Sequence, residues 1–244
     1  MAIAEELSEE SLFGGTLRCL QPRQGYRFSV DAVLLAHFFT PQPEARILDL
    51  GAGCGVVSLI LSHRHPTISL VALELQPRLA EVVRRNVAIN SLASRVTVLQ
   101  GDCRRIADLL PPNSFDWVAA NPPYYPTTSG RHHPETERAK ARHEILGGIG
   151  EMAQAAAFAL KSGGRAAFVY PAARTEILLS ALRDNGLAPK RLRMVHAYPE
   201  TEAGLVLVEA VKDGGEGLEV LSPFCLCQEK GGGYTVEMAA MYAG

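Results

Sequence analysis

The chain has 244 residues, 24 Lys and Arg against 26 Asp and Glu, a formal net charge of -2 and 47% hydrophobic residues. This composition is that of a globular protein and excludes a disordered or collagen-like chain. The near-zero net charge also argues against a uniformly basic nucleic-acid binder. The first ten residues are acidic and do not resemble a signal peptide, and no apolar run approaches the roughly 18 residues of a membrane span, so we expect a cytoplasmic protein.

Strand and helix patterns alternate along most of the chain, after an amphipathic helix expected over 29–39. The expected strands are 46–50, 69–75, 95–100, 115–120, 165–170, 191–196 and 204–211. The expected helices between them are 56–63, 78–90, 104–109, 149–160 and 174–185. Such alternation predicts an α/β fold with a parallel sheet and helices on both of its faces.

Both ends of the chain extend this core. Residues 11–45 form an N-terminal extension, and residues 212–244 are Gly-rich and predicted to be irregular, with a hairpin around 231–233. No linker separates two independent units, so the sequence predicts a single domain over 1–244.

The cysteines are odd in number and have no paired C-x-x-C spacing, which fits a reducing compartment. They are Cys19, Cys54, Cys103, Cys225 and Cys227. No third or fourth ligand lies near Cys225 and Cys227 in the sequence, so we expect a structural or incidental role and no metal.

The first motif with chemical content runs from Asp49 to Gly55, as D-L-G-A-G-C-G, where a buried strand turns into a helix. Glycines here permit a tight turn and let backbone N–H groups approach a ligand, with the N-terminus of a helix behind them. The spacing is G-x-G-x-G, which differs from the G-x-G-x-x-G of dinucleotide binders. We therefore expect Gly51, Gly53 and Gly55 to cradle a nucleotide-like cofactor.

Acidic residues follow the next two expected strands. Glu74 ends the second strand, where its carboxylate can accept hydrogen bonds from both hydroxyls of a ribose. Asp102 follows the third strand, where it can accept from an adenine amino group. Three adjacent strand ends thus offer a glycine cradle, a ribose acceptor and an adenine acceptor.

The second motif, Asn121-Pro122-Pro123-Tyr124, follows the fourth expected strand. The two prolines make a rigid lip at the carboxyl edge of the sheet, where ligands bind in such folds. The side-chain oxygen of Asn121 and the carbonyl of Pro122 are acceptors for the two hydrogens of a planar amino group, on which the Tyr124 ring can stack. A Pro-rich turn without function is the alternative for this motif on its own.

These motifs, in this order, resemble those of class I S-adenosylmethionine-dependent methyltransferases that modify amino nitrogens. Two further stretches, 24–35 (QGYRFSVDAVLL) and 138–144 (RAKARHE), resemble the bacterial tRNA(Val) adenine-N6 methyltransferase family. The resemblance covers about residues 11–211. It implies a doubly wound, seven-stranded, mostly parallel Rossmann-like methyltransferase fold whose last strand is antiparallel.

The resemblance also implies which residues hold S-adenosylmethionine. It places Gly51, Gly53, Gly55, Glu74 and Asp102 on the cofactor, with Asp49 at the head of the glycine motif. It further implies that Arg27, Phe28 and Asp31 close over the methionine end of the cofactor. The helix of the N-terminal extension is thereby expected near the cofactor site.

The expected reaction is methyl transfer to an exocyclic amine, most specifically N6 of an adenine in tRNA. This amine is a poor nucleophile because its lone pair is delocalised into the ring. Asn121 and Pro122, by accepting its N–H bonds, would favour the pyramidal geometry that frees the lone pair, with Tyr124 stacked on the base. No general base is evident beside the motif.

A basic segment, 125–143, follows the lip and is expected to overhang the acceptor pocket. We expect phosphate contacts from Arg131, Arg138, Lys140 and Arg142, since a protein must grip the backbone to extract a base. The alternative is a solvated, mobile loop. His132, His133 and His143 complete no metal-ligand pattern.

Other functions remain open at this point. Ribosomal RNA is the nearest rival substrate. A protein-glutamine N5 methyltransferase is a second rival, but such enzymes carry a sizeable helical domain where this chain has only 1–48 ahead of Asp49. A non-enzymatic RNA-binding scaffold is disfavoured by the intact motifs.

The charge is unevenly distributed. Residues 1–10 carry four acids and no base, and residues 199–244 carry eight acids and two bases. Residues 11–198 carry 22 bases and 14 acids, a net charge of +8. The near-neutral total therefore conceals a basic core, and salt-sensitive RNA binding is expected.

Overall fold

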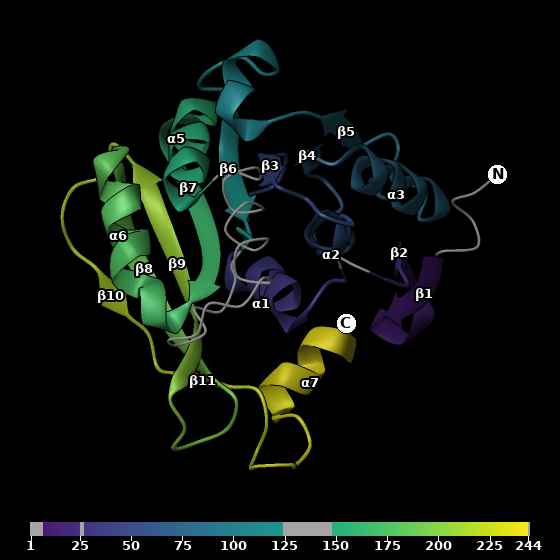
Figure 1. The fold of residues 1–244 in the computed structure, drawn as a ribbon, viewed down its shortest axis with the longest axis vertical. Coiled ribbons are helices and arrows are strands. Elements are labelled where there is room, and N and C mark those ends of the chain that lie inside the picture. Colours follow the sequence, from purple (N-terminus) through teal and green to yellow (C-terminus); the bar gives the residue numbers. More distant parts are fainter. Residues whose placement is uncertain (1–6, 25–26, 124–147, 244) are drawn as a thin grey trace, which may run out of the picture.

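A computed structural model of the chain describes residues 7–24, 27–123 and 148–243, and a nine-stranded sheet dominates this part (Figure 1). The strand order is β10-β8-β9-β7-β6-β3-β4-β5, with β11 paired to β8. The seven main strands are β3 (Arg46–Leu50), β4 (Ser69–Glu74), β5 (Val96–Gln100), β6 (Phe115–Ala120), β7 (Leu160–Pro171), β8 (Leu187–His196) and β9 (Ala203–Lys212).

The directions of these strands confirm the predicted fold class. β9 runs antiparallel to both of its neighbours, β7 and β8, whereas the pairs from β7 through β6, β3 and β4 to β5 are parallel. Two short strands, β10 (Glu219–Val220) and β11 (Phe224–Cys225), lengthen the edge beyond the seven predicted strands.

The helices agree with the predicted ones, apart from two differences. They are α1 (Val30–Phe38), α2 (Val56–Arg64), α3 (Pro77–Ile89), α5 (Ile149–Ala159), α6 (Thr175–Asp184) and α7 (Val236–Ala243). Every helix in the described ranges is too short or too polar to cross a bilayer.

The two differences concern short segments. The helix expected over 104–109 is a 3-10 helix, η3 (Cys103–Asp108), because only six residues separate its cap, Asp102, from the turn that follows. Helix α7 lies in the segment predicted to be irregular. Eight residues make a marginal helix on their own, and here the fully buried side chain of Met238 anchors it to the core.

The hairpin predicted around 231–233 is reduced to a turn closed by one isolated antiparallel bridge. The Gln228 N–H donates to the Gly233 carbonyl at 3.0 Å, and a single bridge joins Cys227 to Tyr234. All five cysteines are free thiols.

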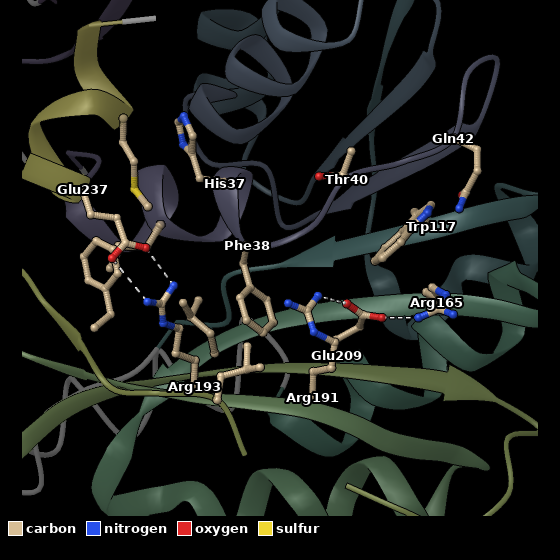
Figure 2. Close-up of a pocket in the computed structure, with 15 residues that line it drawn as sticks. His37, Phe38, Thr40, Gln42, Trp117, Arg165, Arg191, Arg193, Glu209 and Glu237 are labelled. Atoms are coloured by element: carbon tan, nitrogen blue, oxygen red, sulfur yellow. Dashed lines mark hydrogen bonds and ion pairs between the residues drawn. The ribbon is translucent and has the colours of Figure 1, made fainter. Parts of the chain in front are cut away.

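Charged side chains join the three strands at the antiparallel end of the sheet (Figure 2). Glu209 of β9 is 2% exposed and forms ion pairs with Arg165 of β7 and Arg191 of β8. On the same face, Arg193 of β8 pairs with Glu237 of α7 at 3.0 Å, which ties the C-terminal helix to the sheet.

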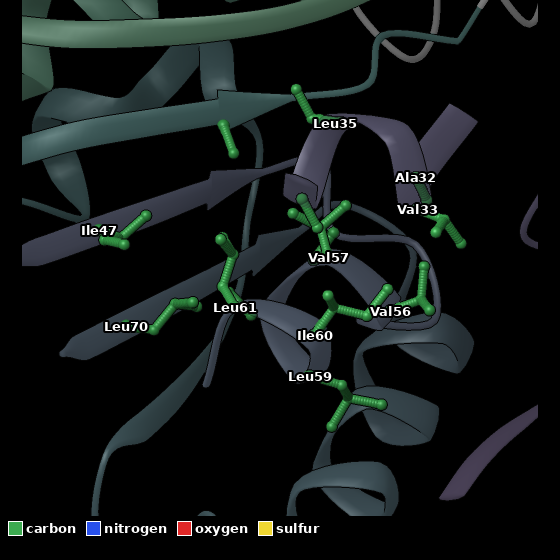
Figure 3. Packing of buried hydrophobic residues seen from close by; sticks show 14 of the residues in the cluster. Ala32, Val33, Leu35, Ile47, Val56, Val57, Leu59, Ile60, Leu61 and Leu70 are labelled. Atoms are coloured by element: carbon green, nitrogen blue, oxygen red, sulfur yellow. The ribbon is translucent and has the colours of Figure 1, made fainter. Parts of the chain in front are cut away.

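Apolar layers cover both faces of the sheet. Alternate residues of β3 enter different layers, with Ile47 facing α1, α2 and α3, and Leu48 facing α5 and α6. Figure 3 shows the first layer, where Leu61 of α2 lies beside Leu70 of β4 and Val33 of α1 lies farther along the same layer. Complete burial of each such side chain contributes about 1.5–3 kcal/mol. Because the central strands are buried on both faces, their sequences are nearly continuous apolar runs.

An antiparallel hairpin of β1 (Leu7–Leu12) and β2 (Leu17–Pro22) precedes this core and has no counterpart among the predicted strands. Two asparagine side chains bind its β2 edge, Asn86 of α3 and Asn90 at the C-cap of that helix. Asn90 accepts from the Arg18 N–H at 2.9 Å and donates to the Arg18 carbonyl at 2.7 Å.

Asn86 joins the hairpin to the glycine loop. Its fully buried side chain accepts from the Leu20 N–H at 2.7 Å and donates to the carbonyls of Leu20 and Cys54, each at 2.8 Å. The two amides of α3 therefore satisfy backbone groups that a neighbouring strand would otherwise bond. Because Cys54 belongs to the glycine motif, the hairpin supports the site.

We expect Asn86→Ala to lower the free energy of unfolding by about 2–4 kcal/mol, since the buried Cys54 carbonyl and two partly buried groups of Leu20 lose their partners. Urea unfolding monitored by circular dichroism measures this loss. Asn90→Ala is the matched control, with an expected loss of about 1 kcal/mol, because Asn90 is partly exposed. Equal losses in the two variants would contradict the role given to Asn86.

Candidate active site

Four adjacent strands end at one pocket. In the order β6-β3-β4-β5, their carboxyl ends lead into Asn121, Gly51, Glu74 and Gly101, all of which line this pocket. The other lining residues are Gly53, Leu73, Leu75, Gln76, Leu79, Cys103, Pro123 and Met152. The structure thus brings the two motifs of the sequence to the same cavity, at the edge where α/β sheets bind ligands.

The glycine loop turns sharply at the end of β3. Gly51, Gly53 and Gly55 have φ angles of 78°, 60° and 85°, a region that favours glycine. The N–H groups of Gly51 and Ala52 donate to the Leu73 carbonyl at 2.9 and 3.0 Å, which holds the loop against β4. A Cβ at Gly55 would lie 2.9 Å from Val83 Cγ1, so this glycine also permits α2 and α3 to approach.

Glu74 fastens two loops with one carboxylate. Oε2 accepts from the Gly53 N–H and Oε1 from the Gln76 N–H, each at 2.8 Å. Burial raises the pKa of Glu74, and these backbone hydrogen bonds oppose the rise. A carboxylate has about four acceptor positions. The remaining ones suit the two hydroxyls of a ribose, because Glu74 also lines the pocket.

Asp49 lies behind the loop and does not line the pocket. Its Oδ2 accepts from the Ser58 hydroxyl at 2.6 Å and the Ser58 N–H at 3.1 Å, which fixes the first turn of α2 to the end of β3. Asp49 is fully buried, and burial raises its pKa to about 6. Its contacts indicate a supporting role for the glycine loop.

Asp102 caps η3 at the end of β5. Its carboxylate accepts from the Arg104 N–H at 2.9 Å and forms an ion pair with the Arg104 guanidinium. These hydrogen bonds lower the pKa of Asp102, so it is a ready anionic acceptor. Its chain neighbours Gly101 and Cys103 line the pocket, while Asp102 itself lies at its margin.

The lip after β6 is only partly within the described residues. Asn121 and Pro123 line the pocket and are half-buried, and Pro122 is buried between them. Tyr124 and the expected phosphate-contacting residues Arg131, Arg138, Lys140 and Arg142 lie outside the described residues, as do His132, His133 and His143. Their predicted roles stay predictions.

The residues expected over the methionine end of the cofactor lie on the chain leading into α1. Arg27 donates to Glu10 at 3.0 Å and to the Ser8 hydroxyl at 3.0 Å, which connects it to the N-terminal hairpin. Phe28 packs against the first apolar layer, and Asp31 is buried in the first turn of α1, where burial raises its pKa. None of these three lines the described pocket.

Sequence reasoning missed several apolar residues of the pocket. Met152 lies in the helix predicted over 149–160 and packs in the core, and its Cε also lies 3.3 Å from the position of a Cβ on Gly51. Leu75 and Leu79 form another wall. Leu75, directly after Glu74, was the one signal in the sequence for this apolar wall, since a flat ring beside the ribose needs apolar neighbours.

Metal ligands do not gather in the described part of the chain. Within it, His, Cys, Asp and Glu side chains form no group of three or more that could hold an ion.

Comparisons with known proteins place the chain in a family. Residues 29–177 match the family model described as methyltransferase small domain. The tRNA1(Val) (adenine(37)-N6)-methyltransferase of Porphyromonas gingivalis is 30% identical over 75% of this chain and 73% of its own length. The protein of the same name in Aliivibrio fischeri is 26% identical over 76% of this chain and 77% of its own length.

Solved structures share the fold. A predicted O-methyltransferase of Agrobacterium tumefaciens superimposes with a TM-score of 0.71 at 23% identity, covering 87% of this chain and 95% of that one. P. horikoshii TYW2 in complex with MeSAdo gives a TM-score of 0.60 at 16% identity, covering 86% of this chain and 73% of that one.

The raised pKa of Asp49 predicts a pH dependence of stability. Its pKa is about 6 in the folded chain against an ordinary value of about 4, so the folded state binds more protons between these pH values. The stabilisation from this proton is complete below about pH 4 and is lost as the pH rises through about 6.

Asp49→Asn keeps an acceptor for Ser58 and has no proton to lose. From pH 4 to pH 7, the free energy of unfolding of the wild type should therefore fall by about 2–3 kcal/mol relative to that of the variant. Urea unfolding at a series of pH values measures it. A difference that does not change with pH would show that Asp49 titrates normally.

Proposed function

The chain belongs to the methyltransferase small domain family, and we propose that it transfers a methyl group from S-adenosylmethionine to N6 of an adenine in tRNA. The observation that carries this proposal is the shared pocket, where the glycine loop and Glu74 lie beside Asn121. The names of the relatives from Porphyromonas gingivalis and Aliivibrio fischeri support the adenine and the tRNA.

The pocket has the chemistry that this cofactor needs. A Cβ at Gly51 would lie 3.3 Å from Met152 Cε, which is closer than an ordinary van der Waals contact, so a side chain there would crowd the pocket. The free acceptor positions of Glu74 suit the ribose, and Leu75, Leu79 and Cys103 offer an apolar place for the adenine ring. We assign Asp102 to the adenine amino group, at the margin of the same pocket.

The lip would position the acceptor amine. Bound S-adenosylmethionine supplies an electrophilic methyl group on its sulfonium. Asn121 stands at the end of a buried strand, and two prolines restrict the backbone that follows it. The Asn121 oxygen and the Pro122 carbonyl would accept the two N–H bonds of the adenine amine and hold its nitrogen lone pair toward the methyl group.

Tyr124 completes the lip in this proposal by stacking on the base. Arg131, Arg138, Lys140 and Arg142 would contact tRNA phosphates beyond the lip, and Arg27, Phe28 and Asp31 would close the methionine end. These assignments rest on the sequence motifs.

The substrate class is tested by incubating the purified protein with radiolabelled S-adenosylmethionine and separate pools of tRNA, ribosomal RNA and release factor. The RNA pools are prepared by transcription in vitro, so that they carry no modification. We expect label in tRNA. Label in release factor alone would identify a protein-glutamine methyltransferase, and label in ribosomal RNA alone would move the substrate to that RNA.

We expect Asn121→Ala to abolish methyl transfer while the cofactor dissociation constant changes by no more than a few fold. In this proposal the Asn121 side chain contacts the substrate amine in the transition state and does not contact the cofactor. Single-turnover assays and calorimetric titration measure the two quantities. Asn90→Ala, on the far end of α3, should retain wild-type turnover. Unchanged turnover in Asn121→Ala would remove the proposed mechanism.

A further inference from the structure

A second cavity, of about 540 Å³, lies on the α1 face of the sheet near its antiparallel edge (Figure 2). Strands β6 to β9 form its floor, and α1 and α7 form its walls. It shares no lining residue with the pocket of the glycine loop. Three arginines and two glutamates line it, namely Arg165, Arg191, Arg193, Glu209 and Glu237.

The floor of this cavity carries more positive than negative charge. The two oxygens of Glu209 each pair with a different guanidinium, that of Arg165 and that of Arg191, the latter at 3.0 Å. Two guanidiniums on one carboxylate leave a local charge of about +1, because arginine stays protonated. Glu237 neutralises Arg193 separately, and Phe38 projects between the two groups (Figure 2).

The exposed fractions of these side chains show that the positive groups, and not the carboxylate, are accessible from the cavity. Glu209 is 2% exposed, whereas the side chains of Arg165 and Arg191 are 43% and 37% exposed. A guanidinium has five N–H donors, and each arginine directs one nitrogen to Glu209. The carboxylate therefore lies between the two guanidiniums, with one cation on each side of it (Figure 2), and both arginines line the cavity with N–H donors to spare.

Aromatic rings fix the two guanidiniums further. Arg165 lies 5.9 Å from the centroid of Trp117, and Arg191 lies 5.4 Å from the centroid of Phe38. Thr40 and Gln42 line the same cavity and add polar groups at its rim. Positioned arginines lose little entropy when they bind an oxyanion, and their planar forks match phosphate geometry.

We propose that this cavity, the arginine pocket, binds a phosphate group through the N–H donors of Arg165 and Arg191 that Glu209 does not engage. Glu209 is a positioning residue that sets the spacing of the two cations and also reduces their charge. Two sources can supply the phosphate, namely the backbone of an RNA or a free phosphate compound. Trp117 precedes Asn121 by four residues of one strand, roughly 13 Å, so a single tRNA could span both places.

Calorimetric titration of the full-length protein with inorganic phosphate, at constant ionic strength, tests the pocket. We expect Arg165→Gln and Arg191→Gln each to weaken phosphate binding about 10-fold, the effect of losing one charged hydrogen bond. Arg183→Gln, an exposed residue of α6 on the opposite face, makes the same change of charge and should bind phosphate as the wild type does.

Glu209→Gln gives the sharper test because it predicts a gain. It removes the carboxylate, keeps the shape of the side chain and raises the local charge from about +1 to about +2, so phosphate should bind several-fold more tightly. This variant decides the question even where loss of an arginine unfolds the protein, which thermal denaturation reports. A purely structural ion-pair cluster predicts no phosphate binding in the wild type or in Glu209→Gln, and that result overturns the proposal.

Filter binding of unmodified tRNA distinguishes the two sources of the phosphate. This part of the test rests on the proposed function. Weaker tRNA binding in Arg191→Gln than in Arg183→Gln, with competition by inorganic phosphate, supports the RNA backbone. Equal tRNA binding in these variants, together with phosphate binding by the wild type, supports a free phosphate compound. The phosphate titration uses no RNA, so its failure is separate from a failure of tRNA methylation.

Discussion

The buried carboxylate of Glu74 is the interaction on which the site depends. It accepts the backbone N–H groups of Gly53 and Gln76 and so joins the loop after β3 to the loop after β4. Burial of this charge is costly without such hydrogen bonds. The same carboxylate lines the pocket, so in the proposed function one residue both builds the cavity and binds the ribose of the cofactor.

Buried hydrogen bonds behind the glycine loop support this edge of the sheet. Asp49 fixes the start of α2 through Ser58, and Asn86 connects the carbonyl of Cys54 in the glycine loop to the N-terminal hairpin. These contacts leave the loop little freedom, which is the condition for electrostatic preorganisation at the neighbouring lip. The rest of the fold thereby holds Asn121 and the glycine loop in fixed positions around one pocket.

The sequence predicts the seven main strands and both motifs because buried strands and glycine turns leave local signals. It does not predict the β1–β2 hairpin or α7, whose stability comes from distant partners such as Asn86, Asn90 and the pocket around Met238. The arginine pocket is invisible for the same reason, since Arg165, Arg191 and Glu209 come together only through strand pairing. Met152 has a second role because the core and the pocket of the glycine loop meet at its side chain.

The central claim is that the lip directs methylation to an exocyclic amino nitrogen. Digestion of the methylated RNA to nucleosides, followed by chromatography and mass spectrometry against standards, tests this most directly. The account predicts N6-methyladenosine as the product, because Asn121 and Pro122 offer acceptors for the N–H bonds of that amine. A methyl group on a ring nitrogen or on a ribose hydroxyl would contradict it.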